Sequence, residues 1–206
     1  IVLIFANIAV LVVLSNEEDF DSIPPLPENE IFHILNTELI PREKVTTFCV
    51  NESVIVLFYD QQGLANVYSH EGTFLYGLQV STIKNGKGGI ALKDGVLYIK
   101  ARGNRMYVFK EDGLIQSFLH SEKPEEYERI IKIIEADKKY EIDGDAYHYL
   151  PETNKVVKQT SQGAMVSIIS MPQINDSVRV HSMLLLLLIA GLAHFVRRTG
   201  VGLREP

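Results

Sequence analysis

Short apolar runs separated by turn dipeptides fill the centre of this chain. Between Gly88 and Phe118, the turn dipeptides are Asp94-Gly95, Gly103-Asn104 and Asp112-Gly113. The apolar runs that they separate are Ile90–Leu92, Val96–Ile99, Met106–Phe109 and Leu114–Phe118. Glycine and asparagine supply the positive φ of tight hairpin turns, and the runs are rich in residues that favour strands. The pattern predicts one four-stranded antiparallel sheet.

The same turn spacing recurs before and after this segment. The turn residues follow one another at steps of nine or ten, at Ser53, Gly63 and Gly72, then Gly95, Asn104 and Gly113, then Gly144, Asn154 and Gly163. The strands between them also correspond, as Val54–Tyr59 does with Val96–Ala101 and Ala146–Leu150. We therefore expect three four-stranded units, at about 44–80, 87–120 and 138–170, each packed against its neighbours.

A helical pattern separates the second and third units, between Ser121 and Lys139. Its apolar residues recur at helical spacing, as Tyr127, Ile130, Ile131 and Ile134. Pro124 suits the first turn, Ser121 lies near the start, and acidic residues precede basic ones as the helix dipole favours. We expect this amphipathic helix to cover a sheet edge or face, with a membrane-surface helix as the less favoured alternative.

Both ends of the chain are strongly apolar. Ile1–Leu14 is broken only by Asn7, and Met183–Val196 is followed by a pair of arginines, a stop-transfer pattern. We interpret both as membrane anchors, with a cleaved signal peptide as the alternative for the first. The predicted organisation is a transmembrane helix at 1–15, an acidic, proline-rich linker at 16–30, a β domain at 31–174, a transmembrane helix at 179–198 and a cytoplasmic tail at 199–206. The β domain would then be extracytoplasmic.

Composition and residue spacing exclude several chemistries. The net charge of −6 argues against a nucleic-acid partner, which needs clustered lysine and arginine. Cys49 is the only cysteine, so no disulfide forms within the chain, and we expect it to be buried in the run Thr47–Val50. The six histidines have no metal-binding spacing, so we predict no metal site and no cofactor. No catalytic residues can be grouped, which favours binding over catalysis.

The central unit also resembles a known repeat. The matching residues are Gly89-Ile90-Ala91, Asp94-Gly95, Leu97-Tyr98-Ile99, Asn104-Arg105, Val108-Phe109 and Asp112-Gly113, and they are similar to the NHL-repeat blade of β-propellers. The resemblance implies four-stranded blades around a channel, usually six of them, in proteins that bind ligands, partners or RNA and sometimes catalyse. This chain departs from the pattern at Lys100-Ala101-Arg102, where family blades often carry an aspartate, and it has only three units.

Three blades leave two open edges. A homodimer could complete a six-bladed ring, a partner protein could cover the edges, or the chain could cover them with its 121–139 helix and a strand at 31–35. The predicted fold is mainly β, with three propeller-blade-like four-stranded antiparallel sheets, one inserted amphipathic helix and a transmembrane helix at each end.

The predicted function is that of a membrane-anchored extracytoplasmic binding or sensing module for a protein or small-molecule partner. The alternative is a structural or assembly component of a membrane complex, and a propeller lyase or lactonase is a third, less favoured hypothesis. The predicted contact residues are Lys87, Arg102 and Arg105, because rigid sheets commonly display function on loops.

Overall fold

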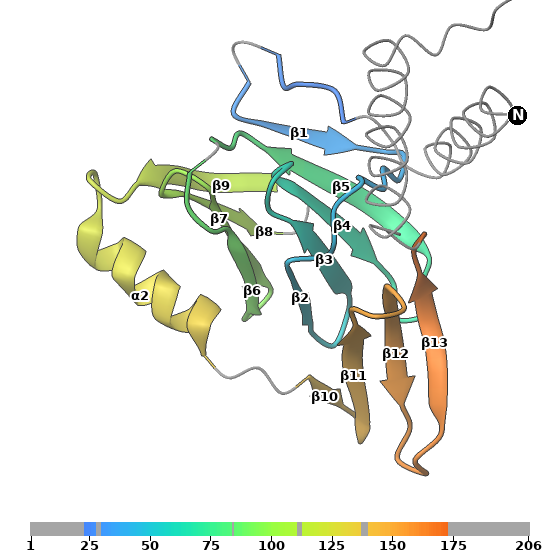
Figure 1. Ribbon diagram of the computed structural model, residues 1–206. Coiled ribbons are helices and arrows are strands. Elements are labelled where there is room, and N and C mark those ends of the chain that lie inside the picture. The colour runs from blue at the N-terminus through green and yellow to red at the C-terminus, as the bar shows by residue number, and fades with distance from the viewer. Residues whose placement is uncertain (1–22, 28–29, 84, 111–112, 137–139, 173–206) are drawn as a thin grey trace, which may run out of the picture. The chain divides into compact units, whose positions relative to one another are not determined.

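The computed structural model describes residues 23–27, 30–83, 85–110, 113–136 and 140–172, shown in colour in Figure 1. They belong to a compact unit that runs from Phe20 to Gln173. Among these residues, no helix is long and apolar enough to cross a membrane. The predicted transmembrane helices at 1–15 and 179–198 and the tail at 199–206 lie outside the described residues.

The first sheet has five antiparallel strands. Its strands are β1 (Phe32–Leu35), β2 (Thr47–Val50), β3 (Ile55–Tyr59), β4 (Leu64–Tyr68) and β5 (Phe74–Val80), in the order β1-β5-β4-β3-β2. Strand β1 pairs with β5, with Phe32 opposite Val80. The chain therefore covers the outer edge of this sheet with a strand of its own, one of the alternatives that the sequence left open.

The second and third sheets each have four antiparallel strands. The second contains β6 (Gly89–Lys93), β7 (Val96–Ala101), β8 (Arg105–Lys110) and β9 (Gly113–Leu119) in sequence order. The third contains β10 (Glu141–Ile142), β11 (Asp145–Leu150), β12 (Lys155–Gln159) and β13 (Met165–Ser170), also in sequence order. The prediction of a mainly β fold is confirmed, and the three sheets fit propeller-like blades.

Most of the turn residues used to find the repeat have the positive φ that tight turns require. Positive φ angles occur at seven of the nine predicted positions, namely Gly63, Gly72, Gly95, Asn104, Gly144, Asn154 and Gly163. Ser53 differs, because its turn is held by the Asn51 side chain, whose Oδ1 accepts the N–H groups of Ser53 and Val54 at 2.9 Å each. The spacing thus marked real turns, formed by two different local mechanisms.

Helix α2 (Pro124–Glu135) covers one face of the second sheet. Tyr127 and Ile130 are buried against Met106, Val108 and Phe118. Pro124 lies in the first turn as predicted, the residue at the N-cap is Lys123, and no side chain caps the helix. The favoured prediction, that this helix packs on the sheets, is confirmed.

The first sheet lies between the other two. Alternate residues of β3 point to opposite faces, so that Val56 and Phe58 join a core with Phe109 of the second sheet, whereas Leu57 joins a core with Val156 of the third. The order in space is therefore helix α2, second sheet, first sheet, third sheet (Figure 1).

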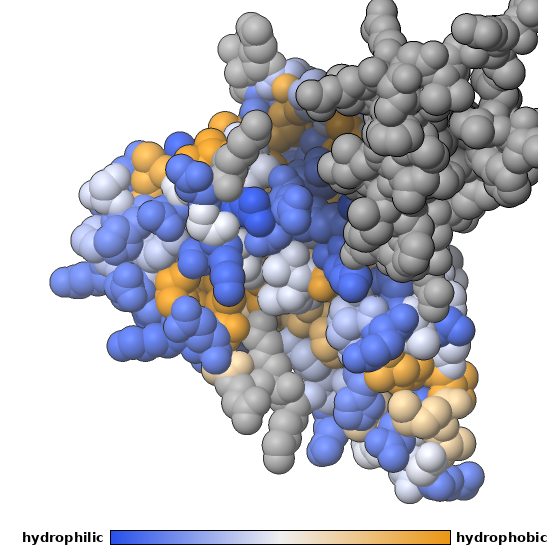
Figure 2. All heavy atoms as spheres, viewed as in Figure 1, coloured by the Kyte–Doolittle hydropathy of each residue, from blue (hydrophilic) through white to orange (hydrophobic). Residues whose placement is uncertain are grey.

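The third sheet has a more open surface than the first. On its last strand, β13, the side chains of Met165 and Val166 are 54% and 44% exposed. Apolar residues also gather over this sheet on the face seen in Figure 2, where most of the remaining coloured surface is hydrophilic. The first sheet, by contrast, has both faces of β3 and β4 buried.

Candidate functional site

The loops that carry the predicted contact residues meet at one end of the first and second sheets. The segment 81–88 connects the two sheets and crosses the turn between β7 and β8. The N–H of Ile83 donates to the carbonyl of Arg102 at 3.4 Å, and the N–H of Gly103 donates to the carbonyl of Asn85 at 3.0 Å. These backbone hydrogen bonds hold the two loops side by side.

The three predicted contact residues have different environments within these loops. Lys87 is exposed. Arg105 is half-buried, and its Nη1 donates to Ser117 Oγ at 3.3 Å. The guanidinium of Arg102 faces the buried carboxylate of Asp60, with Nε 3.4 Å from Oδ2 and Nη2 3.4 Å from Oδ1. Arg102 is therefore engaged within the protein, and Lys87 and Arg105 are the cations better placed to meet a partner.

Asp60 and Arg102 stand at equivalent positions of two repeat units. Asp60 directly follows β3, and Arg102 directly follows β7, the corresponding strand of the next unit. The first unit thus carries an aspartate at the repeat position where the second carries an arginine, and these two side chains form an ion pair. This ion pair joins the two sheets at the end that carries the 81–88 connection and the β7–β8 turn, which we call the contact loops.

A second carboxyl group lies beside this ion pair. Glu43 is only 8% exposed, and its Oε1 accepts the N–H of Gln61 at 2.9 Å. The hydroxyl of Thr46 lies between the two acids, 3.1 Å from Asp60 Oδ1 and 3.5 Å from Glu43 Oε1. Asp60 Oδ2 also accepts the N–H of Gly88 at 3.1 Å. The arrangement connects residues 43–46, the β3–β4 turn and both contact loops.

The environments of the two carboxyl groups shift their pKa values in opposite directions. Burial raises the pKa of Glu43 to about 7, and the neighbouring Asp60 charge adds to the increase. Burial also acts to raise the pKa of Asp60, but hydrogen bonds from Gly88, Glu43, Arg102 and Thr46 outweigh it and lower the pKa. Asp60 is therefore the ionised partner of Arg102, and Glu43 is the acid that holds a proton near neutral pH.

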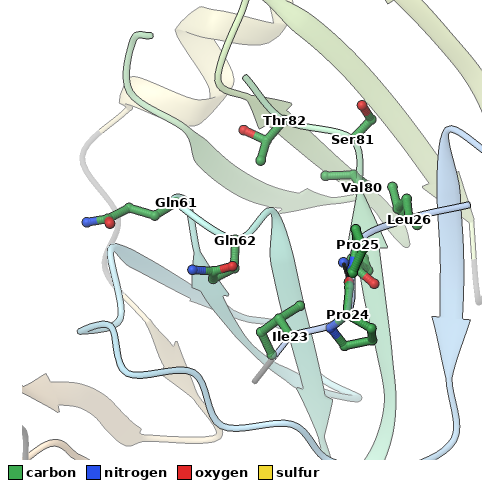
Figure 3. Close-up of a pocket in the computed structure, with 10 residues that line it drawn as sticks. Ile23, Pro24, Pro25, Leu26, Gln61, Gln62, Val80, Ser81 and Thr82 are labelled. Atoms are coloured by element: carbon green, nitrogen blue, oxygen red, sulfur yellow. Dashed lines mark hydrogen bonds between the residues drawn. The ribbon is translucent and has the colours of Figure 1, made fainter. Parts of the chain in front are cut away.

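A groove of about 400 Å³ lies next to this cluster (Figure 3). One wall is the segment 23–26 of the proline-rich linker, and the other walls come from the β3–β4 turn and the residues around the end of β5. The lining residues are Ile23, Pro24, Pro25, Leu26, Gln61, Gln62, Gln79, Val80, Ser81 and Thr82. None of these ten side chains carries a formal charge, so the lining combines amides and hydroxyls with apolar groups.

Hydrogen bonds keep the groove walls in place. Gln79 is 6% exposed, and its Nε2 donates to the carbonyl of Pro24 at 2.7 Å, which attaches the linker to β5. The hydroxyl of Tyr107 donates to the carbonyl of Ser81 at 3.1 Å. The buried Thr82 Oγ1 has no hydrogen-bond partner among the described residues. Gln61 belongs to both the groove and the acid cluster, since its backbone N–H binds Glu43.

The sequence analysis named residues of the two loops near this candidate site, but it did not name the acids and amides. The signal for Asp60 was an acidic residue at the repeat position held by Arg102. Glu43 and Gln79 had no comparable signal, because Glu43 lies in an irregular segment and Gln79 lies within a strand. In the described ranges, no group of three or more His, Cys, Asp or Glu residues could hold a metal ion.

Comparisons with known proteins add little to this geometry. No protein-family model matches the chain, and no curated protein matches it. Fourteen chains of solved structures do match. One of them is the crystal structure of HIRA(644-1017), at 10% identity and a TM-score of 0.32, covering 62% of this chain. This chain spans 39% of the length of that one, and a likeness at this level carries no conclusion about function.

Proposed function

We propose that this chain is a protein-binding module, which receives an extended segment of a partner in the groove and along the adjoining contact loops. The observation that carries the proposal is the groove itself, whose wall residues Ser81 and Thr82 begin the loop that carries the exposed Lys87. Loops on a rigid scaffold are common binding sites. An open groove lined by neutral polar and apolar groups suits the backbone of an extended peptide better than it suits a charged metabolite.

The surroundings of the groove favour a partner segment with apolar and acidic residues. Ile83 is 60% exposed. Its side chain packs so closely on the backbone of Gly103 that a Cβ added at Gly103 would lie 2.3 Å from Ile83 Cγ1. A partly exposed apolar side chain that is held in place by contacts on its inner side can form a binding contact with an apolar side chain of a partner. Lys87 lies on the same loop as Ile83, and Arg105 begins β8 directly after the β7–β8 turn. Both side chains would attract carboxylates, with most of their effect on the association rate.

The proposal also includes several predictions that were made from the sequence. They are the NHL-like character of the blades, the membrane anchoring and the extracytoplasmic position of the β domain with a cytoplasmic C-terminus. A homodimer that completes a six-bladed ring also stays a prediction. Such a ring would need a free face on the second sheet, and α2 packs against that face, so the helix would have to move.

One observation favours the alternative of an assembly component. Strand β13 ends the third sheet, and no other strand of the described residues pairs with its outer edge, where Met165 and Val166 are exposed. A neutral, apolar edge of this kind can accept a strand from another chain. Under this alternative, the partner would contact β13 rather than the groove.

Site-directed photocrosslinking in native membranes tests the proposal. Because the single native cysteine, Cys49, is 1% exposed, an introduced surface cysteine can be labelled selectively. We expect Lys87→Cys carrying a photoreactive label to give a discrete crosslinked product that excess unlabelled native chain suppresses.

Lys93→Cys is the matched control. Lys87 precedes strand β6 and Lys93 ends it, so both are exposed lysines at opposite ends of one strand. Equal products from both positions, or none from Lys87→Cys, would contradict the proposed site. A product from Val166→Cys alone would instead support the assembly role.

A further inference from the structure

A second cavity, of about 310 Å³, lies between the first and second sheets at the end opposite the contact loops. Its lining includes Val54, which comes directly before β3, and Gly95, which comes directly before β7. Asp60 and Arg102, at the contact-loop end, come directly after the same two strands. The cavity shares no lining residue with the groove, so it is a separate site.

The interior of this cavity is apolar. Val56 and Leu97 are 1% and 4% exposed and belong to the core that the two sheets share. Half-buried apolar side chains complete the wall, namely Val54, Tyr76 and Leu92. An apolar ligand that enters such a space buries its own surface and that of the wall. The volume is at the lower end of the range of ligand pockets, about 300–1,000 Å³, which favours a small ligand.

The polar lining residues lie at the mouth. Ser53 and Lys110 are exposed, and Asn51 is half-buried. Among the nine described residues that line the cavity, Lys110 is the one that carries a charge. The mouth therefore presents an ammonium group and a hydroxyl group, both of which donate hydrogen bonds, above an apolar interior.

Asn51 holds one side of the mouth in place. Its Oδ1 accepts the N–H groups of Ser53 and Val54 at 2.9 Å each, and its carbonyl accepts a hydrogen bond from His70 Nε2 at 2.7 Å. At Gly95, in contrast, no atom of the described residues lies within 4 Å of an added Cβ. The cavity thus has one fixed rim and one rim with space for entry.

We propose that this cavity binds a medium-chain fatty acid, with the acyl chain between the two sheets and the carboxylate at the mouth beside Lys110 and Ser53. The apolar interior suits the chain, and the cation and hydroxyl at the mouth are complementary to the carboxylate. The small volume favours a medium chain over a long one. The inference does not depend on the proposed function, because it concerns other residues at the other end of the sheets.

Photolabelling of the purified full chain in a nonionic detergent tests the inference. The probe is decanoic acid that carries a diazirine at its terminal carbon, and mass spectrometry locates the labelled residues. We expect label on the cavity wall, in the segments 54–56 and 92–97, and an excess of unlabelled decanoic acid should suppress it. Label found only outside these segments, for example in the apolar ends 1–14 and 183–196, would overturn the inference.

Lys110→Glu tests recognition of the carboxylate. Reversal of the charge at the mouth should reduce labelling of the cavity wall by about five- to tenfold, because an attraction is replaced by a repulsion. Lys44→Glu is the matched control, since Lys44 is an exposed lysine before β2, near the other end of the first sheet, and the change in net charge is the same. Equal effects of the two variants, or no effect of Lys110→Glu, would contradict the proposed site.

Val54→Phe tests the position of the acyl chain. The added ring reduces the space between the two sheets and should remove most of the label, while circular dichroism checks that the sheets are intact. Retained labelling would overturn the inference. If this variant does not fold, the exposed Lys110→Glu decides. Crosslinking from Lys87→Cys reports on the other end of the sheets, so failure of this site and failure of the proposed function are distinguishable.

Discussion

The two faces of the first sheet are both buried, yet they use polar groups differently. Toward the second sheet, Val56 and Phe58 pack among apolar neighbours, and the charged groups gather at the end of the interface, at Asp60 and Arg102. Toward the third sheet, the core contains Tyr59 and Tyr147 and hydrogen bonds run through it. His70, for example, lies 2.8 Å from the Tyr147 hydroxyl and 2.7 Å from the carbonyl of Asn51.

The difference indicates where a binding site can form. In the interface with the third sheet, the polar groups are already committed to internal partners, as when the Tyr140 hydroxyl donates to the carbonyl of Phe48 at 2.6 Å. In the interface with the second sheet, the polar groups lie at one end, beside loops and a groove. That end keeps amides and cations at the surface, so it is the end that we assign to binding.

The largest expected effect comes from the apolar interface. Phe58 is fully buried between the first and second sheets, and Phe58→Ala should lower the free energy of unfolding by about 3–5 kcal/mol through lost burial and a cavity. Urea unfolding of the full chain measures this change. Leu75→Ala is the control, because Leu75 is 46% exposed and should change the stability by less than about 0.5 kcal/mol. Equal losses would mean that this interface is not a packed core.

A smaller effect is expected where the loop before β6 meets the acid cluster. A Cβ added at Gly88 would lie 2.8 Å from both Asp60 Cβ and Phe58 Cε1. Gly88→Ala should therefore destabilise the chain by about 1–3 kcal/mol through overpacking. At Gly113 the nearest atom of the described residues to an added Cβ is 3.7 Å away, so Gly113→Ala should leave the thermal midpoint almost unchanged. A neutral Gly88→Ala would show that the two sheets are not held closely at this end.

The smallest expected effect is the difference in stability between removing the Tyr147 hydroxyl and removing the Tyr59 hydroxyl, both in the interface with the third sheet. Tyr147→Phe removes a hydrogen-bond partner from His70 and should cost about 1 kcal/mol. The hydroxyl of Tyr59 meets only the weak sulfur acceptor of Met171, at 3.1 Å, among its described contacts, so Tyr59→Phe should cost less. Denaturation midpoints of the two variants, measured together, check the order. The reverse order would remove the contrast between the two faces.

Local structure was predictable from the sequence because it depends on local chemistry. The strands of the second sheet and its Asp94-Gly95 turn follow from short apolar runs and from residues that accept positive φ. The order of the sheets in space did not follow, although the sequence contains a signal for it. Strand β3 reads as a continuous apolar run, IVLFY, and β4, LANVY, is interrupted only by Asn66, a pattern that is typical of strands buried on both faces.

The candidate site was predictable in part for the same reason. Lys87 and Arg102 lie on loops that the turn spacing locates, and Arg105 begins the strand that follows the second of these loops. The pairing of Arg102 with Asp60 and the position of Glu43 depend on contacts between distant segments, which no periodicity reports. Glu43 in particular belongs to a segment without helix or strand.

The most direct test of the central claim is whether the groove and the contact loops form one binding site. Gln62 lines the groove and is exposed, so a photoreactive label on Gln62→Cys can be compared with one on Lys87→Cys in extracts of cells that express the chain. We predict the same crosslinked partner from both positions, and a strongly reduced yield from Gln62→Cys when Lys87→Glu is added. Different partners from the two positions, or a yield that is unaffected by Lys87→Glu, would contradict the account.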